Sequence, residues 1–278
     1  MAYAQIVKAD GEEEAFDPLK LEESLKRAGA TSLARKSIVD RIVRELKDGM
    51  TTSEIYRHAF EHLRKEEELP VAARYSIKRA VFDLGPSGFP FEQFVAEIFK
   101  AQGWSTQTGA ALMGRCVSHE VDVFMKKGDT RAGVEVKFHN APGTKTDVKD
   151  ALYVYARFED LKQAPDEDMR VDEGWLITNT RFTRNAIRYG QCTGLRLMGW
   201  TYPRDNGIMH LVERSGIHPL TCLTTLTDGE KRMLLSKNIV LCRALKQGRH
   251  VLEGYGIAPR NIAAIIEEAE RLCSPIGS

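Results

Sequence analysis

The sequence predicts a multidomain α/β protein: a small, mainly helical unit, then an α/β sandwich around a mixed central sheet, then a helical C-terminal module. Residues 17–85 carry several amphipathic helix patterns, whereas residues 119–178 alternate strand patterns with a helix pattern. A stretch dense in glycine and proline, 84–90, separates the two. After about Leu220 the patterns are helical again. The expected domain boundaries are 1–86, 89–215 and 220–278.

Composition narrows the class of protein. Of the 278 residues, 42% are hydrophobic and 28% are charged, so the chain can bury a large core. The formal net charge is +1, so a nucleic-acid site has to be a local basic patch. The five cysteines form no CxxC pair, which favours reduced thiols over a zinc ribbon. Without a signal-like N-terminus or a long apolar run, we expect a soluble, cytoplasmic protein that does not contact membranes.

Residues 1–86 are predicted to form two strands joined by a turn, followed by four helices. The turn is at Asp10-Gly11. Asp17 is the expected N-cap of the first helix and Pro18 its first residue. Thr51–Glu54 (TTSE) is a capping box before the third helix. The expected strands are at 4–8 and 15–16, and the expected helices are at 17–29, 34–47, from 52 through Leu63, and 70–85.

This unit resembles an ATP-cone, the nucleotide-sensing module attached to ribonucleotide reductases and their repressors. The matching residues are Val7-Lys8, Asp10-Gly11, Phe16, Lys20-Leu21 and the helix 72–82. The resemblance implies that ATP or dATP binds as an effector at Val7, Lys8, Gly11 and Lys20, with both lysines on the phosphates. Ala9 departs from the family, which usually has an arginine there. The alternative is a helical packing domain with solvated lysines.

Residues 119–138 are predicted to form a β-hairpin. Apolar residues alternate with others on both sides of a polar turn at 126–130. Side chains two apart on a strand share a face, so Glu135 and Lys137 project together, and pairing brings Asp122 beside them. Two carboxylates suit Mg²⁺ or Mn²⁺, and a lysine can position a water. The alternative is a surface hairpin with a weak Glu–Lys ion pair.

Asp122 followed by Glu135-Val136-Lys137 resembles the D…(E/Q)xK signature of the PD-(D/E)xK nuclease superfamily. The resemblance implies a metal-dependent DNA endonuclease in which Asp122 and Glu135 bind the metal and Lys137 positions the attacking water. Many proteins of the Mrr-like branch have glutamine where this chain has Glu135, and a glutamate favours metal binding.

The flanking segments resemble the Mrr-like, restriction-endonuclease branch of that superfamily. Residues 89–104 are similar to its opening helix, with Glu92 at the acidic position, and residues 175–200 are similar to its closing strand–helix–strand. Glu92 would support the metal site; its alternative role is that of a first-turn acid favoured by the helix dipole. We expect helices at 91–102, 147–161 and 183–189 and strands at 175–178 and 195–200. Lys145, Lys149 and Arg157 are candidate contacts to DNA phosphates, with an exposed amphipathic face as the alternative.

The C-terminal module has a basic surface. Between Gly229 and Arg260 there are seven Lys or Arg residues and two acids. Residues 254–257 before a helix resemble a helix-hairpin-helix turn, although no alanine follows Gly256 at the usual spacing. That resemblance implies phosphate contacts by Gly254, Gly256 and Arg260. The alternative is a helical cap or a dimerisation element.

The expected function is therefore metal-dependent hydrolysis of DNA phosphodiester bonds by a homo-oligomer, with ATP or dATP as regulator. The chain has no GxxxxGKS or GxxxxGKT loop, so nucleotide binding need not imply hydrolysis. One alternative is a nucleotide-responsive DNA-binding regulator with a catalytically silent nuclease core. Another is an assembly protein in which the ATP-cone only oligomerises.

Overall fold

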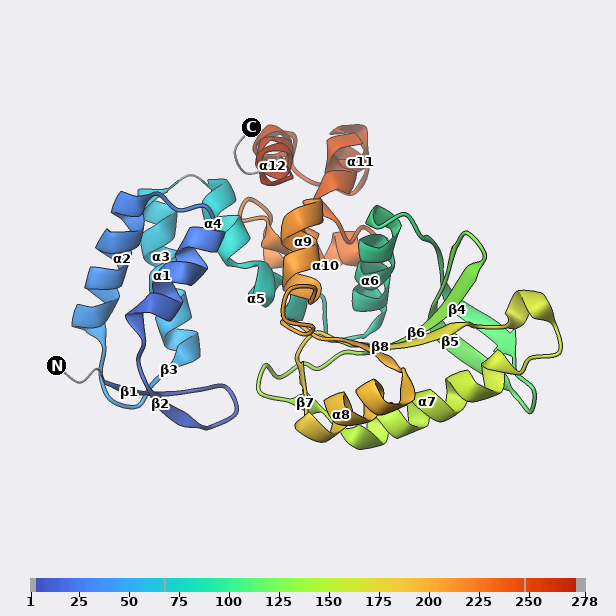
Figure 1. Cartoon of the computed structure of the whole chain (residues 1–278). Helices are drawn as coiled ribbons and strands as arrows, with labels where there is room; N and C mark the ends of the chain where they lie inside the picture. Colours follow the sequence, from blue (N-terminus) through green and yellow to red (C-terminus); the bar gives the residue numbers. More distant parts are fainter. Residues whose placement is uncertain (1–3, 68, 248, 274–278) are drawn as a thin grey trace. The chain divides into compact units, whose positions relative to one another are not determined.

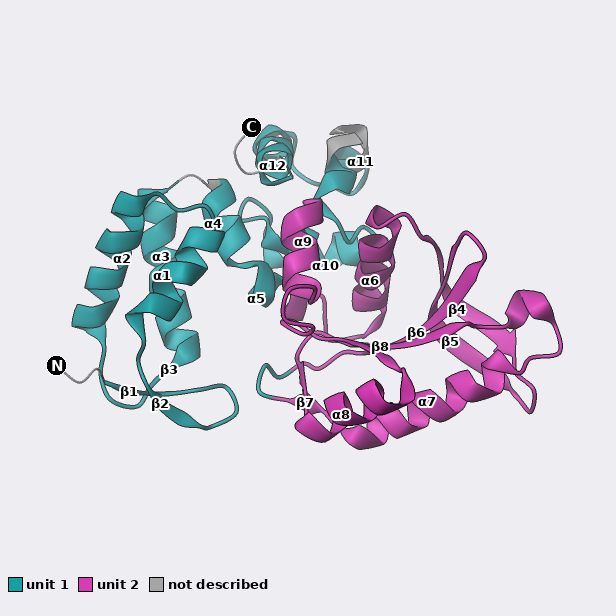
Figure 2. Ribbon diagram, in the orientation of Figure 1, with its two compact units in different colours: residues 1–80, 141–143, 218–278 teal, residues 81–140, 144–217 magenta. Residues whose placement is uncertain are grey.

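The structure, a computed structural model, describes residues 4–67, 69–247 and 249–273 (Figure 1). The chain forms two compact units (Figure 2). The first unit combines residues 1–80, 141–143 and 218–278, and the second combines residues 81–140 and 144–217. Both ends of the chain therefore contribute to the first unit, and the middle forms the second.

The N-terminal part of the first unit is a three-stranded sheet followed by helices. Strand β1 (Gln5–Val7) pairs antiparallel with β2 (Glu13–Ala15) and parallel with β3 (Met50–Thr51). Gly11 makes the expected turn between the first two strands with φ +83°, a conformation that glycine adopts readily. The helices are α1 (Pro18–Arg27), α2 (Ser32–Glu45), α3 (Thr52–Glu66), α4 (Leu69–Tyr75) and α5 (Ile77–Phe82), the last of which ends in the second unit.

Local capping determines where these helices begin. The Asp17 side chain accepts a hydrogen bond from the Leu19 backbone N–H at 3.0 Å, and Pro18 is the first helical residue. Thr51 and Glu54 form the expected reciprocal capping box of α3. The helix expected at 70–85 is instead two helices, because the chain breaks at Ser76, whose hydroxyl donates to the Ala73 carbonyl at 2.8 Å.

The C-terminal part of the first unit contains α10 (Asp228–Ser236), α11 (Arg249–Gly254) and α12 (Pro259–Leu272). Arg74 of α4 donates to the Arg271 carbonyl at 3.1 Å, which joins α12 to the N-terminal helices. Glu268 of α12 is 2% exposed, yet its carboxylate is satisfied by the backbone N–H and hydroxyl groups of Thr224 and Thr225. A buried, fully hydrogen-bonded carboxylate thus holds the 224–225 loop on this helix.

The second unit is an α/β sandwich around a mixed sheet of order β10-β8-β6-β5-β4. Strands β4 (Ser105–Met113), β5 (Ser118–Lys127) and β6 (Thr130–Lys137) pair antiparallel, and β6, β8 (Glu173–Thr178) and β10 (Arg196–Met198) pair parallel. Figure 1 shows α7 (Val148–Lys162) and α8 (Arg184–Thr193) on one face of the sheet and α6 (Phe89–Ala101) and α9 (Ile208–Ser215) on the other. Two further residue pairs, β7 (Lys145–Thr146) and β9 (Arg181–Phe182), form a short parallel ladder.

Helix α7 approaches the sheet closely because two strands carry glycine beneath it. A Cβ atom at Gly133 of β6 would lie 2.3 Å from the Phe158 ring, and one at Gly174 of β8 would lie 2.5 Å from it. Phe158 is buried against these two positions. This packing sets the distance between α7 and the strand that carries Glu135 and Lys137.

Some elements were not predicted. Strand β4 is absent from the sequence-based expectation because its residues are mostly small or polar, and only Ala110 and Leu112 of the strand are buried. The short strands β3, β7 and β9 and the helix α9 were also missed. Among the described residues, no helix is both long and apolar enough to cross a membrane.

Candidate functional site

The hairpin of β5 and β6 brings the predicted carboxylates together at the point where its ladder ends. The register of this pair runs from Lys127↔Thr130 to Val123↔Val134, and Asp122 and Glu135 come next on their strands. The Asp122 carboxylate accepts a hydrogen bond from the Val136 backbone N–H at 2.7 Å. At this point a carboxylate, instead of a carbonyl of the neighbouring strand, accepts the hydrogen bond from the Val136 amide.

Helix α7 holds both side chains of the Glu-x-Lys motif. Arg157 Nη1 pairs with Glu135 Oε2, and Lys137 Nζ lies 3.1 Å from Asp150 Oδ1. Because both partners belong to α7, Glu135 and Lys137 project on the face of the sheet that this helix covers, as the two-residue spacing predicts. The structure therefore brings Asp122, Glu135 and Lys137 into one place.

The carboxylates of this cluster repel one another in a partly desolvated environment. Burial and then the charge of Asp122 raise the pKa of Glu135 to about 7, while Arg157 and Lys137 oppose the shift. Burial, then Asp122 and Glu120, raise the pKa of Glu92 to about 7. Burial also raises the pKa of Asp122, against the hydrogen bond from Val136. Glu92, in the first turn of α6, is thus close enough to interact electrostatically with Asp122 and Glu120.

These residues fit a hard divalent cation. Mg²⁺ is usually held by one or two carboxylates and keeps several waters, so Asp122 and Glu135 suffice in number and type. A cation would also relieve the repulsion that raises the pKa values of Glu135 and Glu92. In the described parts of the chain, no group of three or more His, Cys, Asp or Glu residues is placed to hold a metal ion.

Arg157, expected from the sequence as a candidate contact to DNA phosphates, also pairs with Glu135, and sequence reasoning missed this second role. Besides Glu135, its guanidinium donates to the Glu120 carbonyl at 3.1 Å and to the Tyr153 hydroxyl at 2.9 Å, and its Cζ lies 4.9 Å from the Tyr153 ring centroid. The i, i+4 spacing of Tyr153 and Arg157 indicates that the two side chains share a helix face, but it does not indicate which strand that face packs against. Asp150, the partner of Lys137, was missed for the same reason.

The two candidate phosphate-binding lysines of this unit lie at the start of α7. Lys145 is in β7, and Lys149 is in the first turn of the helix, where its backbone N–H donates to the capping Asp147 at 2.8 Å. Both side chains are exposed. The structure thus places them near the end of the helix that carries Asp150.

The predicted nucleotide-binding lysines share one acidic partner. Lys8 Nζ lies 2.8 Å from Glu12 and 3.4 Å from Glu14, and Lys20 Nζ lies 3.3 Å from Glu14. The pairing with Glu12 raises the pKa of Lys8. Val7 and Gly11 flank Lys8 on β1 and in the turn that follows it. The two lysines are therefore gathered about the Glu14 carboxylate.

A cavity of about 370 Å³ in the first unit was not anticipated. It lies at the start of α3. It is lined by two aromatic rings, Tyr56 and Phe60, and by two guanidinium groups, Arg57 and Arg79. Tyr56 also stacks on Tyr75, with ring centroids 5.2 Å apart. None of the four predicted nucleotide-binding residues lines it.

In the turn between α11 and α12, two backbone amides donate hydrogen bonds to carbonyls of α11. The Gly256 N–H donates to the Glu253 carbonyl at 2.9 Å, and the Ile257 N–H donates to the Leu252 carbonyl at 3.1 Å. These bonds cap the end of α11, with Gly256 at φ +78°. Gly254 is the last residue of α11, and Arg260 is exposed in the first turn of α12.

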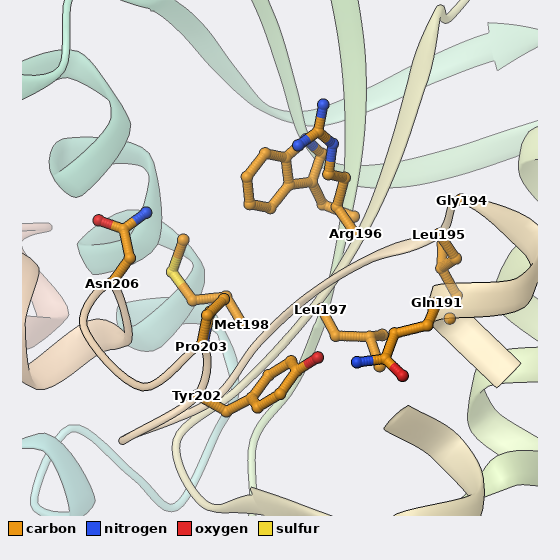
Figure 3. Close-up of a pocket in the computed structure, with 11 residues that line it drawn as sticks. Gln191, Gly194, Leu195, Arg196, Leu197, Met198, Tyr202, Pro203 and Asn206 are labelled. Atoms are coloured by element: carbon orange, nitrogen blue, oxygen red, sulfur yellow. The ribbon is translucent and has the colours of Figure 1, made fainter. Parts of the chain in front are cut away.

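Two cavities of the second unit lie beside its sheet. One, of about 420 Å³, lies at the edge strand β10 (Figure 3). There Arg196 lies over the Trp175 ring, with 5.7 Å from Cζ to the ring centroid, and pairs with Glu173 at 2.9 Å. None of the predicted site residues lines this cavity. The other, of about 330 Å³, is lined in part by Arg157, which pairs with Glu135.

Comparison with known proteins assigns each part of the chain. Residues 4–81 match the ATP cone domain, residues 86–200 match a restriction endonuclease family, and residues 218–273 match the family described as AF1548-like, C-terminal. An uncharacterized protein of Archaeoglobus fulgidus is 33% identical over 179 residues, which are 64% of this chain and 99% of that protein. This chain belongs to the family of that archaeal protein.

A crystal structure described as a protein of unknown function, AF1548, agrees with this assignment. It is 31% identical in sequence, with a TM-score of 0.57, and the match covers 67% of this chain and 98% of that one. The expected order of an ATP-cone followed by a restriction-endonuclease-like domain is confirmed, and so is the fold class. The C-terminal part, expected to resemble a helix-hairpin-helix module, matches the AF1548-like C-terminal family.

Proposed function

We propose that this member of the AF1548-like family is a metal-dependent DNA endonuclease. The observation that carries the proposal is the convergence of Asp122, Glu135 and Lys137 at the end of the β5–β6 ladder, within a restriction-endonuclease-like domain. Asp122 and Glu135 would hold Mg²⁺ or Mn²⁺. The bound ion would supply charge neutralisation at the phosphate and lower the pKa of a water.

The remaining side chains have supporting roles in this proposal. Lys137, oriented by Asp150 at 3.1 Å, would hold the attacking water by its ammonium group. Arg157 would keep the Glu135 carboxylate in one orientation, as partners of metal-binding carboxylates commonly do. Glu92 would add negative charge from the N-terminal turn of α6. Lys145 and Lys149, with Arg260 in the other unit, are proposed contacts to DNA phosphates, which would make binding dependent on salt.

The first test is cleavage of plasmid, linear and branched DNA with Mg²⁺ or Mn²⁺. We expect Asp122→Ala and Lys137→Ala each to reduce the rate by at least about a hundredfold, because each would remove a group required by the chemistry. Asp129→Asn is the matched control, since Asp129 is an exposed acid in the turn of the same hairpin. Folded variants that cut as fast as the unmodified protein would refute the assignment.

One observation favours a second candidate function. Both motif side chains, Glu135 and Lys137, are engaged by α7 through Arg157 and Asp150. If these pairs persist in the presence of Mg²⁺, the core is silent and the protein is a nucleotide-responsive DNA-binding regulator. A calorimetric Mg²⁺ titration separates the two functions, because only the endonuclease requires binding that Glu135→Gln weakens.

We also propose that ATP or dATP binds the ATP-cone as an effector in a homo-oligomer. The lysines gathered about Glu14 and the cavity with Arg57 and Arg79 offer the cations and rings that a nucleotide needs. Phosphate binding at Lys8 and Lys20 would compete with Glu14 for the same ammonium groups. Nucleotide binding is therefore expected to rearrange the β1–β2 turn.

A further inference from the structure

A cavity of about 330 Å³ is connected to the proposed catalytic cluster through Arg157. Its walls come from Cys116, Val117 and His119, around the start of β5, and from Tyr153, Ala156, Arg157 and Asp160 of α7. Arg157 lines the cavity and also pairs with Glu135. One guanidinium group therefore separates the cavity from a proposed metal-binding carboxylate.

The walls of this cavity are held in place by one carboxylate. Asp160 accepts hydrogen bonds from the backbone N–H groups of Cys116 at 2.9 Å and Val117 at 3.3 Å, and it lies 2.8 Å from His119 Nε2. The hydrogen bond with His119 is the main cause of a pKa of about 2 for Asp160, so this group is ionised at neutral pH. The cavity is thus pre-formed, and a ligand need not order the 116–119 segment.

The chemistry of the walls favours a neutral, planar ligand over an anion. Asp160 carries a negative charge, and the positive charge of Arg157 is already paired with Glu135. Tyr153 is 63% exposed and Val117 is 55% exposed. The Arg157 guanidinium lies over the Tyr153 ring, so the opposite face of that ring and the apolar Val117 side chain are left to cover a ligand. The volume is at the lower end of the range for ligand pockets, about 300–1,000 Å³. That size suits one nucleobase.

We propose that this cavity receives an unpaired nucleobase from the nucleotide next to the phosphate that is cut. The inference rests on the proposed endonuclease function, because it takes the phosphate to lie at Asp122 and Glu135. A base inside a duplex cannot reach such a cavity without leaving the stack. The substrate class is therefore DNA that already has an unpaired or displaced base at the cleavage position, with the base stacked on the Tyr153 ring.

The experiment measures the contribution of the base by itself. Fluorescence anisotropy gives the affinity of the full chain for two duplexes with Ca²⁺ replacing Mg²⁺: one has a single unpaired adenosine, and the other has an abasic site at that position. Stacking of a base on an aromatic ring is worth about 1–3 kcal/mol, so we expect the adenosine duplex to bind roughly five- to 150-fold more tightly. Gel analysis confirms that the duplexes stay intact.

Three variants locate the effect at Tyr153. Tyr153→Leu should abolish the preference for the adenosine duplex, whereas Tyr153→Phe should retain it because the ring remains. Leu152→Ala is the matched control, since Leu152 is the exposed neighbour on the same helix and does not line the cavity. Equal affinity for the two duplexes, or a preference that survives Tyr153→Leu, would overturn the inference.

The same assay keeps this inference separate from the proposed function. A protein that cleaves DNA with Mg²⁺ but shows no base preference is an endonuclease without a base pocket. A protein that shows the preference, lost in Tyr153→Leu, but never cleaves has the pocket without the activity. A protein that binds neither duplex refutes both.

Discussion

At the scale of single residues, Asp122 satisfies a backbone amide at the point where strand pairing stops. Its carboxylate accepts a hydrogen bond from the Val136 backbone N–H at 2.7 Å, where the β5–β6 ladder has ended. The amide remains satisfied, so the interruption does not leave a buried donor unpaired. The second carboxylate oxygen is the one that we propose binds the cation. One side chain thus stabilises the local backbone and, in the proposed function, would also bind the metal.

Arg157 is expected to act through Glu135. Replacing it in Arg157→Met removes the guanidinium that holds the Glu135 carboxylate. Loss of such a partner typically lowers metal affinity or activity by about 10- to 100-fold, and we expect this loss in the Mg²⁺ dissociation constant measured by calorimetry. Arg157→Lys should be intermediate, because it keeps the charge but not the planar fork. Tighter Mg²⁺ binding by Arg157→Met would show that Arg157 competes with the metal.

The pKa values of Glu135 and Glu92 predict how pH affects the metal-free protein. Both are raised from 4.5 to about 7 in the folded state. Between those two values the folded state holds more protons than the unfolded chain, so the free energy of unfolding decreases as pH rises through this window. Thermal unfolding in EDTA across this range measures the trend, and Glu135→Gln should flatten it.

Metal binding should show the opposite dependence. Only ionised carboxylates bind a hard cation, so Mg²⁺ affinity should rise with pH between about 6 and 8. Calorimetry at several pH values in this window tests the prediction. An affinity that is constant with pH would mean that Glu135 is already ionised or is not a ligand.

At the scale of elements, the position of α7 decides the chemistry of the site. This helix supplies Asp150, Tyr153 and Arg157, and it packs through Phe158 onto glycines of β6 and β8. A larger residue under Phe158 would lift the helix away from Glu135 and Lys137. The glycines are thus required for packing and, through packing, for the site.

Gly133→Ala tests this packing. The added methyl group would lie 2.3 Å from the buried Phe158 ring, so either the ring or the helix must move. We expect a loss of about 1–3 kcal/mol of stability, the usual cost of overpacking a core. Thermal unfolding followed by circular dichroism measures it. Gly229→Ala is the control, because a Cβ there meets only Thr227 Oγ1, at 4.0 Å, and should cost nothing.

At the scale of the whole molecule, both ends of the chain build the first unit and the middle builds the second. The matches to an ATP cone domain and to an AF1548-like C-terminal family therefore fall in one compact unit, and the restriction endonuclease match falls almost entirely in the other. A nucleotide effect on cleavage would have to act through the assembly or through the connections between units. A ligand can shift such an equilibrium only by binding one state better.

Nucleotide should change the size of the assembly and the cleavage rate together. Typical coupling free energies of about 1–3 kcal/mol correspond to roughly five- to 150-fold changes. Light scattering and cleavage assays with ATP, dATP or no nucleotide measure both quantities. Lys20→Ala should abolish the response, whereas Lys26→Ala, a lysine in the last turn of the same helix, should retain it. If neither size nor rate responds, the ATP-cone is only a packing domain here.

The sequence by itself determined the features that depend on neighbouring residues. Helix starts at Pro18, Thr52, Val148 and Arg184 follow from capping residues one position before them, which act over three or four residues of chain. The hairpin that carries Asp122, Glu135 and Lys137 follows from two-residue alternation and a polar turn. The family motifs could be recognised from the sequence because they also consist of residues close together in the chain.

The tertiary structure alone decided the features that depend on distant partners. Strand β4 has a weak pattern and forms because β5 offers it a full ladder of amides and carbonyls. The pairing of Glu135 with Arg157 joins residues 22 positions apart, and no local signal encodes it. The same is true of the cavity beside Arg157, whose walls come from β5 and α7. Packing across a sheet is set by the whole core, so these contacts could not be predicted from any one segment.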